Sequence, residues 1–339
     1  MYGLQRNPDK IIEGDMFICD SSDPSKAQEM VSRALENNAN ALLLPMSLKS
    51  KLEFPTSIPT LFVPDVEEFA QRLSVAFYDA PGRDMMVVGV TGSRGKTTVS
   101  WLICGILEAM EQTTGTLNSV GYSLAGELMD ADGDLWLAPE DDEADQVESS
   151  SPFKITPYHP ERYHVPKETL PQGMEVQKVL SGMRDRGASC AVLECPGSGL
   201  TDGRHKFIDL GVAVHTNFVP PKLSARRERK GWEEGLGYDE MDEEDKGALE
   251  AQLELFDTLM DPTAQAAVLN LDDSVTTMIQ ERIGSNIPIV TYGIENTEVG
   301  NWIVTPSDPS SLLPLSVVPL FFSSGRCCSR DCELFHLGE

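Results

Sequence analysis

A strand, a glycine-rich turn and the start of a helix follow one another at residues 85–99. The apolar run Met85–Val90 leads into Thr91-Gly92-Ser93-Arg94-Gly95-Lys96-Thr97-Thr98, and Val99 begins an apolar stretch with helical spacing. Glycines let several backbone N–H groups converge on an anion, the lysine adds positive charge, and the first threonine hydroxyl can ligate Mg²⁺. The sequence therefore predicts a loop that binds a nucleoside triphosphate.

The spacing of this loop departs from the most common phosphate-loop pattern. That pattern, Gly-x-x-x-x-Gly-Lys-Ser/Thr, needs a glycine where the chain has Val90, and the first loop glycine is instead Gly92. A Gly-Lys-Thr triplet also occurs by chance, so an ordinary β-turn is the alternative. The strand pattern before the loop and the helix pattern after it favour a phosphate site.

The short loop resembles the ATP loop of the Mur ligases, which join amino acids to a nucleotide-linked muramyl precursor of peptidoglycan. Further segments follow in the order of the MurE-like members of that family, including those of plant plastids, over about residues 10–295. These segments are Glu13–Ile18, Asn40–Leu44, Thr169–Pro171, Glu175–Leu180, Ala191–Glu194, Val214–Asn217 and Val268–Asp273. The resemblance implies ATP and Mg²⁺ as cofactors, with the nucleotide held by Gly92, Ser93, Arg94, Gly95, Lys96, Thr97 and Thr98.

Periodicity predicts an α/β protein with two folded domains. Residues 1–80 alternate short apolar runs with amphipathic stretches, which predicts a small, Rossmann-like α/β domain. Residues 81–296 predict a P-loop NTPase-like central domain, because its strands are continuous apolar runs, as in a mostly parallel sheet covered on both faces. The predicted strands of this domain are Met85–Val90, Cys190–Cys195, Gly211–His215, Ala266–Leu271 and Pro288–Tyr292.

The last part of the chain, residues 297–339, has no clear period and resembles no part of the family. We expect it to lack regular structure, and a short partner-binding tail is the alternative. The Mur ligases continue with a third domain that selects the incoming amino acid, carrying an Asp-Asn-Pro-Arg motif in the enzymes that add diaminopimelate. That motif does not occur in this sequence. We therefore expect a truncated chain that lacks the C-terminal ligase domain.

Polar residues at the ends of two of the predicted strands are the other candidates for the site. Ligands of such sheets bind at the carboxyl ends of the strands, where Glu194 and the phosphate loop both fall. A carboxylate there suits a Mg²⁺ ligand beside Thr97, and the matching glutamate of the Mur ligases binds magnesium. A solvated strand-end carboxylate is the alternative. By the same resemblance, Asn270 and Asp272 or Asp273 would lie near the adenosine.

Three positions depart from the family pattern. The histidine that helps to hold a second magnesium is replaced by Lys222, and an ammonium group has no lone pair with which to ligate a cation. The lysine that active ligases carbamylate corresponds to Gln252, aligned on Leu255-Phe256, and an amide cannot form a carbamate. Ser198 stands in the stretch that is Ser-Ser-His in the family. The resemblance therefore predicts a catalytically degenerate protein with at most one magnesium ion.

The formal net charge of −27 argues against a surface that binds nucleic acid directly, since phosphate contacts need clustered Lys and Arg. Much of the acidic charge lies in residues 127–148 and 233–250. Both stretches predict solvated or disordered insertions, and a docking surface for a basic partner is the alternative.

The seven cysteines show no regular framework, and Cys19, Cys104 and Cys190 lie in apolar segments. We expect reduced, buried thiols and a reducing compartment. Cys327, Cys328 and Cys332 lack the spacing of a zinc site. We expect no membrane-spanning segment, because the longest apolar run, Leu312–Phe322, is short and contains Pro314 and Pro319.

The sequence leaves three candidate functions. The first is a structural component of chloroplast biogenesis that retains the ATP loop and associates with the plastid-encoded RNA polymerase, as the resemblance implies. The second is an ATP-dependent amide ligase of peptidoglycan precursor synthesis. The third is a nucleotide-regulated assembly factor. The resemblance implies a plastid location, although the N-terminus has no Arg- and Ser-rich transit segment.

Overall fold

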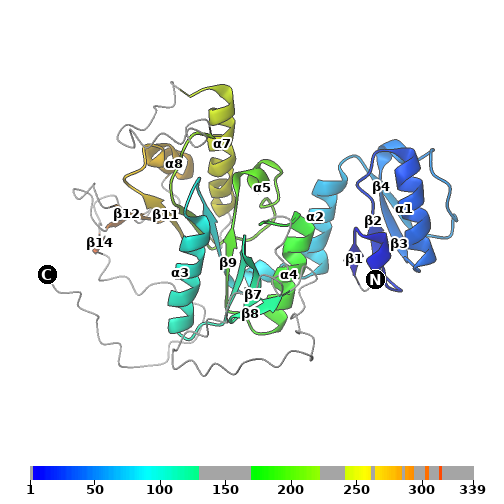
Figure 1. Cartoon of the computed structure of the whole chain (residues 1–339), viewed down its shortest axis with the longest axis horizontal. Helices are drawn as coiled ribbons and strands as arrows, with labels where there is room; N and C mark the ends of the chain where they lie inside the picture. Colours follow the sequence, from blue (N-terminus) through cyan, green and yellow to red (C-terminus); the bar gives the residue numbers. More distant parts are fainter. Residues whose placement is uncertain are drawn as a thin grey trace.

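The computed structural model describes residues 3–129, 169–221, 241–260, 264–284, 287–293, 302–304 and 313–314. They form a small N-terminal α/β part and a larger α/β part, which lie side by side along the long axis of the molecule (Figure 1). The helix that ends the first part lies between its sheet and the second part.

The N-terminal part is a parallel sheet of four strands in the order β1-β2-β3-β4. Helix α1 begins at Pro24 behind Asp23, whose side chain accepts a hydrogen bond from the Lys26 N–H. Helix α2 begins at Val66 behind Asp65, whose side chain accepts from the Glu68 N–H. One sheet face packs on α1 and the other on α2. The elements are β1 (Leu4–Gln5), η1 (Pro8–Lys10), β2 (Met16–Ile18), α1 (Pro24–Glu36), β3 (Ala41–Pro45), η2 (Met46–Leu48), β4 (Thr60–Val63) and α2 (Val66–Phe77).

The larger part is built on a ten-stranded sheet in the order β14-β13-β12-β11-β10-β5-β9-β6-β7-β8. The six central strands are parallel, and antiparallel pairs extend the sheet at both ends. The strands are β5 (Met86–Thr91), β6 (Thr114–Asn118), β7 (Gly121–Leu124), β8 (Glu127–Met129), β9 (Cys190–Glu194), β10 (Val212–His215), β11 (Ala266–Asn270), β12 (Ile289–Tyr292), β13 (Trp302–Val304) and β14 (Leu313–Pro314).

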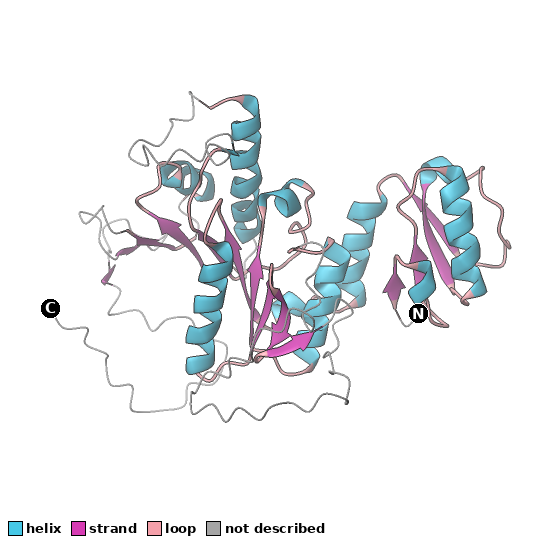
Figure 2. Ribbon diagram, viewed as in Figure 1, coloured by secondary structure: helices cyan, strands magenta, loops and turns pink. Residues whose placement is uncertain are grey.

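Helices cover both faces of this sheet, as Figure 2 shows. Helix α3 (Lys96–Ala109) packs on one face through Cys104 and its neighbours. The other face carries the main hydrophobic core, to which α4 (Gly173–Asp185), α5 (Gly197–Thr201), α7 (Glu243–Asp257) and α8 (Thr276–Ile283) contribute. The short helices η3 (Pro81–Arg83) and η5 (Thr258–Met260) complete the part.

The two parts meet along α2 and α4. Met174 of α4 belongs to the hydrophobic cluster of the N-terminal part. Arg6 lies 2.7 Å from Glu67 of α2 and 3.3 Å from Glu175 of α4, and burial raises the pKa of Glu175 although Arg6 opposes this shift. Side chains from both parts therefore share one packed interface.

The predicted strands of the parallel sheet agree with the structure to within one residue at each end. Two expectations were wrong in part. Residues 243–250, expected to belong to a solvated or disordered insertion, form the first turns of α7, because Asp242 caps the helix and Glu243, Glu244 and Asp245 suit its positive N-terminal end. Within the tail expected to lack structure, β13 pairs antiparallel with β12 and β14 pairs antiparallel with β13.

Residues 127–129 of the first acidic stretch, also expected to belong to an insertion, form β8 and pair antiparallel with β7. The rest of both acidic stretches, residues 130–148 and 233–240, and the rest of the tail lie outside the described residues. Cys19, Cys104, Cys190 and Cys195 are free and buried, and Cys327, Cys328 and Cys332 again lie outside the described part. None of the helices in the described ranges has the length and hydropathy needed to span a bilayer.

Candidate functional site: a phosphate loop at the carboxyl edge of the sheet

The phosphate loop joins the carboxyl end of β5 to α3, and it requires its first glycine. Gly92 has φ +135°, and a Cβ atom there would lie 2.0 Å from the Thr216 Oγ1 and 2.9 Å from the Asn217 carbonyl oxygen. Gly95 has φ +82° but no heavy atom within 4 Å of such a Cβ. The loop is thus pressed against the end of β10 at Gly92 and open to solvent at Gly95.

The segment after β10 fixes the shape of the loop. The Asn217 carbonyl oxygen accepts from the Ser93 N–H at 2.7 Å, and its side-chain oxygen accepts from the Arg94 N–H at 3.1 Å. The Thr216 hydroxyl donates to the Arg94 carbonyl at 2.7 Å. These bonds hold the loop in place before any ligand arrives, which lowers the entropic cost of binding.

Lys96 is the first residue of α3 and the cation of the loop. Its Nζ donates to the carbonyl oxygens of Gly92 at 2.8 Å and Ser93 at 3.5 Å, so it lies under the loop. Burial lowers the pKa of Lys96, and Glu194 opposes the shift. The first N–H groups of α3 have no intrahelical acceptor and carry the positive end of the helix dipole. This arrangement fits the phosphates of a nucleotide.

Thr97 and Glu194 come together as the sequence predicted. The Thr97 hydroxyl donates to Glu194 Oε2 at 2.9 Å, and the same carboxylate oxygen accepts from the Ser119 N–H at 3.0 Å. The Ser119 hydroxyl lies 2.9 Å from that of Thr97. A buried carboxylate beside a hydroxyl provides the hard oxygen ligands that Mg²⁺ prefers, with the remaining ligands left to phosphate and water. The residues present therefore fit one magnesium ion.

The described residues contain no group of three or more His, Cys, Asp or Glu side chains that could hold a metal ion. The Thr97–Glu194 pair supplies two protein oxygens, and Mg²⁺ commonly takes only one or two carboxylates in phosphate-binding sites. A metal at this position would therefore depend on the nucleotide for part of its coordination.

Asn270 and Asp273, expected near the adenosine, contact the segment that supports the loop. The Asn270 amide donates to the Thr216 carbonyl at 2.9 Å. The Asp273 carboxylate accepts from the backbone N–H groups of Phe218 and Val275. Both side chains lie at the same sheet edge as the phosphate loop, since β10 and β11 are parallel neighbours. In this structure they brace the loop after β10.

The three departures from the family pattern lie in different surroundings. Gln252 of α7 is buried, its Nε2 donates to the Ser93 Oγ at 3.4 Å, and its Oε1 has no hydrogen-bond partner. An uncharged amide therefore stands directly beside the phosphate loop. Ser198 is exposed on α5, whereas Lys222 lies outside the described residues. Arg94 and Thr98 of the loop are also exposed.

Two contributors to the site escaped the sequence-based prediction. Ser119 follows β6, whose Thr-Gly-Thr-Leu-Asn sequence lacks the continuous apolar run that marked the other strands. His215 is fully buried at the end of β10, and neither ring nitrogen forms a hydrogen bond. Burial lowers the pKa of His215, while the charge of Asp273 opposes that shift. The imidazole is thus held neutral behind the loop.

Comparison with known proteins agrees with this architecture. The Mur ligase middle domain family matches residues 90–221. A UDP-N-acetylmuramoyl-L-alanyl-D-glutamate–2,6-diaminopimelate ligase of Halalkalibacterium halodurans is 23% identical over 298 residues, covering 87% of this chain and 49% of the ligase. The chloroplastic MurE homologue of that ligase in Arabidopsis thaliana is 26% identical over 298 residues, covering 87% of this chain and 32% of the homologue. The chain therefore spans half or less of the length of these relatives.

A solved structure of a UDP-N-acetylmuramoyl-L-alanyl-D-glutamate–2,6-diaminopimelate ligase has a TM-score of 0.58 at 21% identity. The match covers 89% of this chain and 50% of that chain. This likeness confirms the predicted fold class, an α/β fold of the Mur ligase type with parallel sheets. Residues 90–221 therefore match the Mur ligase middle domain, and most of the chain is similar to MurE ligases and their chloroplastic homologues.

Proposed function

We propose that this protein binds ATP with a single Mg²⁺ ion, does not ligate amino acids, and serves as a structural component of plastid transcription. The observation that carries the proposal is the contrast within one site. Lys96, Thr97 and Glu194 form the arrangement that grips a metal-bound triphosphate, whereas Gln252 contacts the loop at Ser93 with an amide. The side chains that would bind the nucleotide are present, whereas an amide replaces the carbamylated lysine that the family resemblance predicts beside the loop.

The chemistry of ligation explains why this replacement matters. Amide formation passes through an acyl phosphate and a tetrahedral intermediate, whose clustered anionic oxygens must be neutralised by metals and cations. Gln252 can neither carry a carbamate nor bridge two metal ions, and a lysine at position 222 would repel a cation. By analogy with the loss of one oxyanion donor, each such change costs about 10²–10³ in rate. Together with the replacement at Ser198, they support the loss of ligase activity.

A location in plastids is supported by the similarity to a chloroplastic homologue. A role within a protein assembly is supported by helix α3, which packs only one side on the sheet. Trp101, Leu102, Ile106 and Met110, on or directly after α3, are between 46% and 62% exposed, and they account for half of the exposed large apolar side chains in the described ranges. The net charge of −27 favours indirect contact with nucleic acid, through a polymerase subunit.

Purification of the tagged protein from chloroplasts tests both halves of the proposal. Subunits of the plastid-encoded RNA polymerase should copurify, and the purified protein should release no phosphate from ATP when the muramyl dipeptide nucleotide and diaminopimelate are added. Phosphate release that depends on diaminopimelate would instead establish the alternative function, an ATP-dependent amide ligase.

A pair of double variants makes the copurification specific. The Leu102→Ser/Ile106→Ser variant removes apolar surface from α3 and should lower the yield of polymerase subunits severalfold. The control, Ile12→Ser/Leu61→Ser, changes two other exposed apolar residues, 64% and 43% exposed, and should leave the yield unchanged. Equal losses in both variants would contradict a role for α3, and absence of polymerase subunits from the wild-type preparation would contradict the transcription role.

A further inference from the structure

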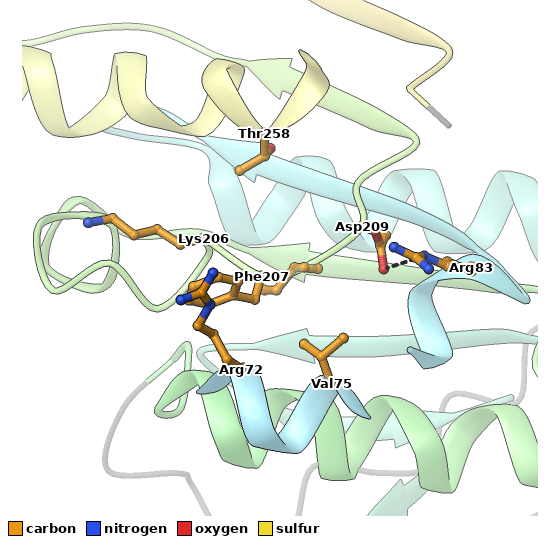
Figure 3. A pocket seen from close by; sticks show the side chains of 8 residues that line it. Arg72, Val75, Arg83, Lys206, Phe207, Asp209 and Thr258 are labelled. Carbon is orange, nitrogen blue, oxygen red and sulfur yellow. Dashed lines mark ion pairs between the residues drawn. The ribbon is translucent and has the colours of Figure 1, made fainter. Parts of the chain in front are cut away.

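A pocket of 370 Å³ lies on the side of the molecule where α2 meets the larger part. Figure 3 shows Arg72 and Val75 on α2, Arg83 on η3, the loop of residues 206–209 between them, and Thr258 above. Its walls come from three stretches that are far apart in the sequence, residues 72–83, residues 206–209 and Thr258. The pocket is thus formed by the tertiary fold, and it joins the N-terminal part to the larger one.

Cations dominate the lining of this pocket. Arg72, Arg83 and Lys206 contribute three positive charges and Asp209 one negative charge, in a chain whose formal net charge is −27. Asp209 lies 3.5 Å from Arg83 and pairs with it. Arg72 pairs at 3.6 Å with Glu68, one helical turn away, and both of these side chains are more than half exposed. Such an exposed pair is weak and can be exchanged for a ligand at little cost.

Lys206 forms no ion pair within the described part of the chain. Burial, and after it the charge of Lys206, lowers the pKa of the adjacent His205 to about 4. The imidazole is therefore uncharged at neutral pH and does not compete with Lys206 for an anion. The ammonium group is a compact donor of three hydrogen bonds. Lys206 is therefore the cation of the pocket most available to an incoming anion.

Phe207 orients the second cation. The guanidinium carbon of Arg72 lies 5.8 Å from the centre of the Phe207 ring, within the range of a cation–π contact. A cation–π contact engages the face of the aromatic ring and does not use the guanidinium N–H groups as donors to an oxygen, so they stay available to an oxyanion. Arginine binds phosphate and carboxylate groups through two parallel hydrogen bonds.

The pocket is distinct from the phosphate loop. Arg83 precedes β5, Asp209 precedes β10 and Thr258 precedes β11, so these residues lie at the amino ends of parallel strands. The phosphate loop follows the carboxyl end of β5. A strand of this length separates the two edges by roughly 20 Å, at about 3.3 Å per residue. A ligand in the pocket would not reach the nucleotide site.

We propose that this pocket binds a small phosphorylated anion carrying two or more negative charges. Its volume admits a small molecule but not a folded domain, and its cations come from both parts of the protein. A ligand that contacts Arg72 and Lys206 together would tie α2 to the larger part. Since it binds the folded chain only, it would also raise the melting temperature.

Titration with inorganic pyrophosphate in the absence of Mg²⁺ tests the proposal. The whole chain is used in a Lys96→Ala background, so that the phosphate loop does not contribute. Calorimetry should detect one site, and adding Arg72→Gln and Lys206→Gln should weaken it at least tenfold. The charge-matched control, Lys26→Gln/Lys49→Gln, changes two exposed cations elsewhere and should bind as the parent does.

Each result decides the matter. The proposal is supported by one site that depends on Arg72 and Lys206 but not on Lys26 and Lys49. It is overturned if millimolar pyrophosphate gives no heat, or if both double variants lose affinity equally. Melting curves without ligand, expected to coincide for all variants, separate a loss of binding from a loss of fold. Because the background lacks Lys96, the outcome is independent of nucleotide binding at the loop.

Discussion

Replacing Lys96 with alanine is expected to weaken ATP binding about 100-fold or more. Its Nζ lies under the loop, against the carbonyl oxygens of Gly92 and Ser93, and burial has lowered its pKa, so a bound triphosphate would restore a strong partner to a partly desolvated ammonium. Hydrogen bonds to charged groups contribute about 1.5–3 kcal/mol each, and about 1.4 kcal/mol corresponds to a factor of ten. Isothermal calorimetry with Mg²⁺ and ATP measures the change.

The control for this variant is Lys49→Ala, which removes an exposed lysine of the N-terminal part. It should bind ATP with the affinity of the wild type. If the wild-type protein gives no heat at millimolar ATP, the loop does not bind nucleotide, and the first half of the proposed function fails. If Lys96→Ala and the wild type bind equally well, the nucleotide lies elsewhere on the protein.

Replacing Gly92 with alanine is expected to destabilise the protein by about 3 kcal/mol or more, because it combines strain with overpacking. The added Cβ would fall 2.0 Å from the Thr216 Oγ1 and within 3.0 Å of two Asn217 backbone atoms, at a φ of +135°. Backbone atoms cannot rotate away, so β5 and β10 would have to separate locally. Urea denaturation of the isolated variant measures the free energy of unfolding.

Gly95→Ala separates the two causes. Gly95 has φ +82° and no heavy atom within 4 Å of the new Cβ, so its replacement destabilises the protein only through the left-handed backbone conformation. That cost is about 1–2 kcal/mol for an L-residue. Gly92→Ala should therefore be clearly less stable than Gly95→Ala. Equal losses would mean that the loop moves away from β10 freely, and the bracing by Thr216 and Asn217 would then contribute little.

Much of the fold follows from the sequence because the central strands are buried on both faces. Continuous apolar runs such as that of β9 (Cys190–Glu194) can be recognised without knowledge of their neighbours. The edge of the sheet where β6 meets the antiparallel strand β7 is different. Strands β6 and β7 carry Thr, Ser, Gly and Asn, and the buried hydroxyls of Thr116 and Ser123 bond to each other at 2.9 Å across the pair. Such polar residues suit a buried strand because their hydroxyl groups find partners on the neighbouring strand, and the sequence of one strand does not reveal those partners.

Some contacts of the candidate site could likewise be predicted from the sequence, and others could not. The proximity of Thr97 and Glu194 could be predicted, because Glu194 ends β9, Thr97 follows the loop after β5, and parallel strands end at one edge. The contact between Gln252 and Ser93 could be approached only through the family resemblance, since it depends on how α7 packs. The bonds from Thr216 and Asn217 to the loop depend on close packing of two turns. No spacing in the sequence specifies such packing.

The most direct test of the central claim is a crystal structure of the protein with Mg²⁺ and a non-hydrolysable ATP analogue. We predict that the triphosphate lies over the N-terminus of α3 and that one magnesium ion contacts the Thr97 hydroxyl and the Glu194 carboxylate. We predict no metal ion at Gln252. A second magnesium ion ligated by protein side chains, or a nucleotide bound away from Lys96, would contradict this account.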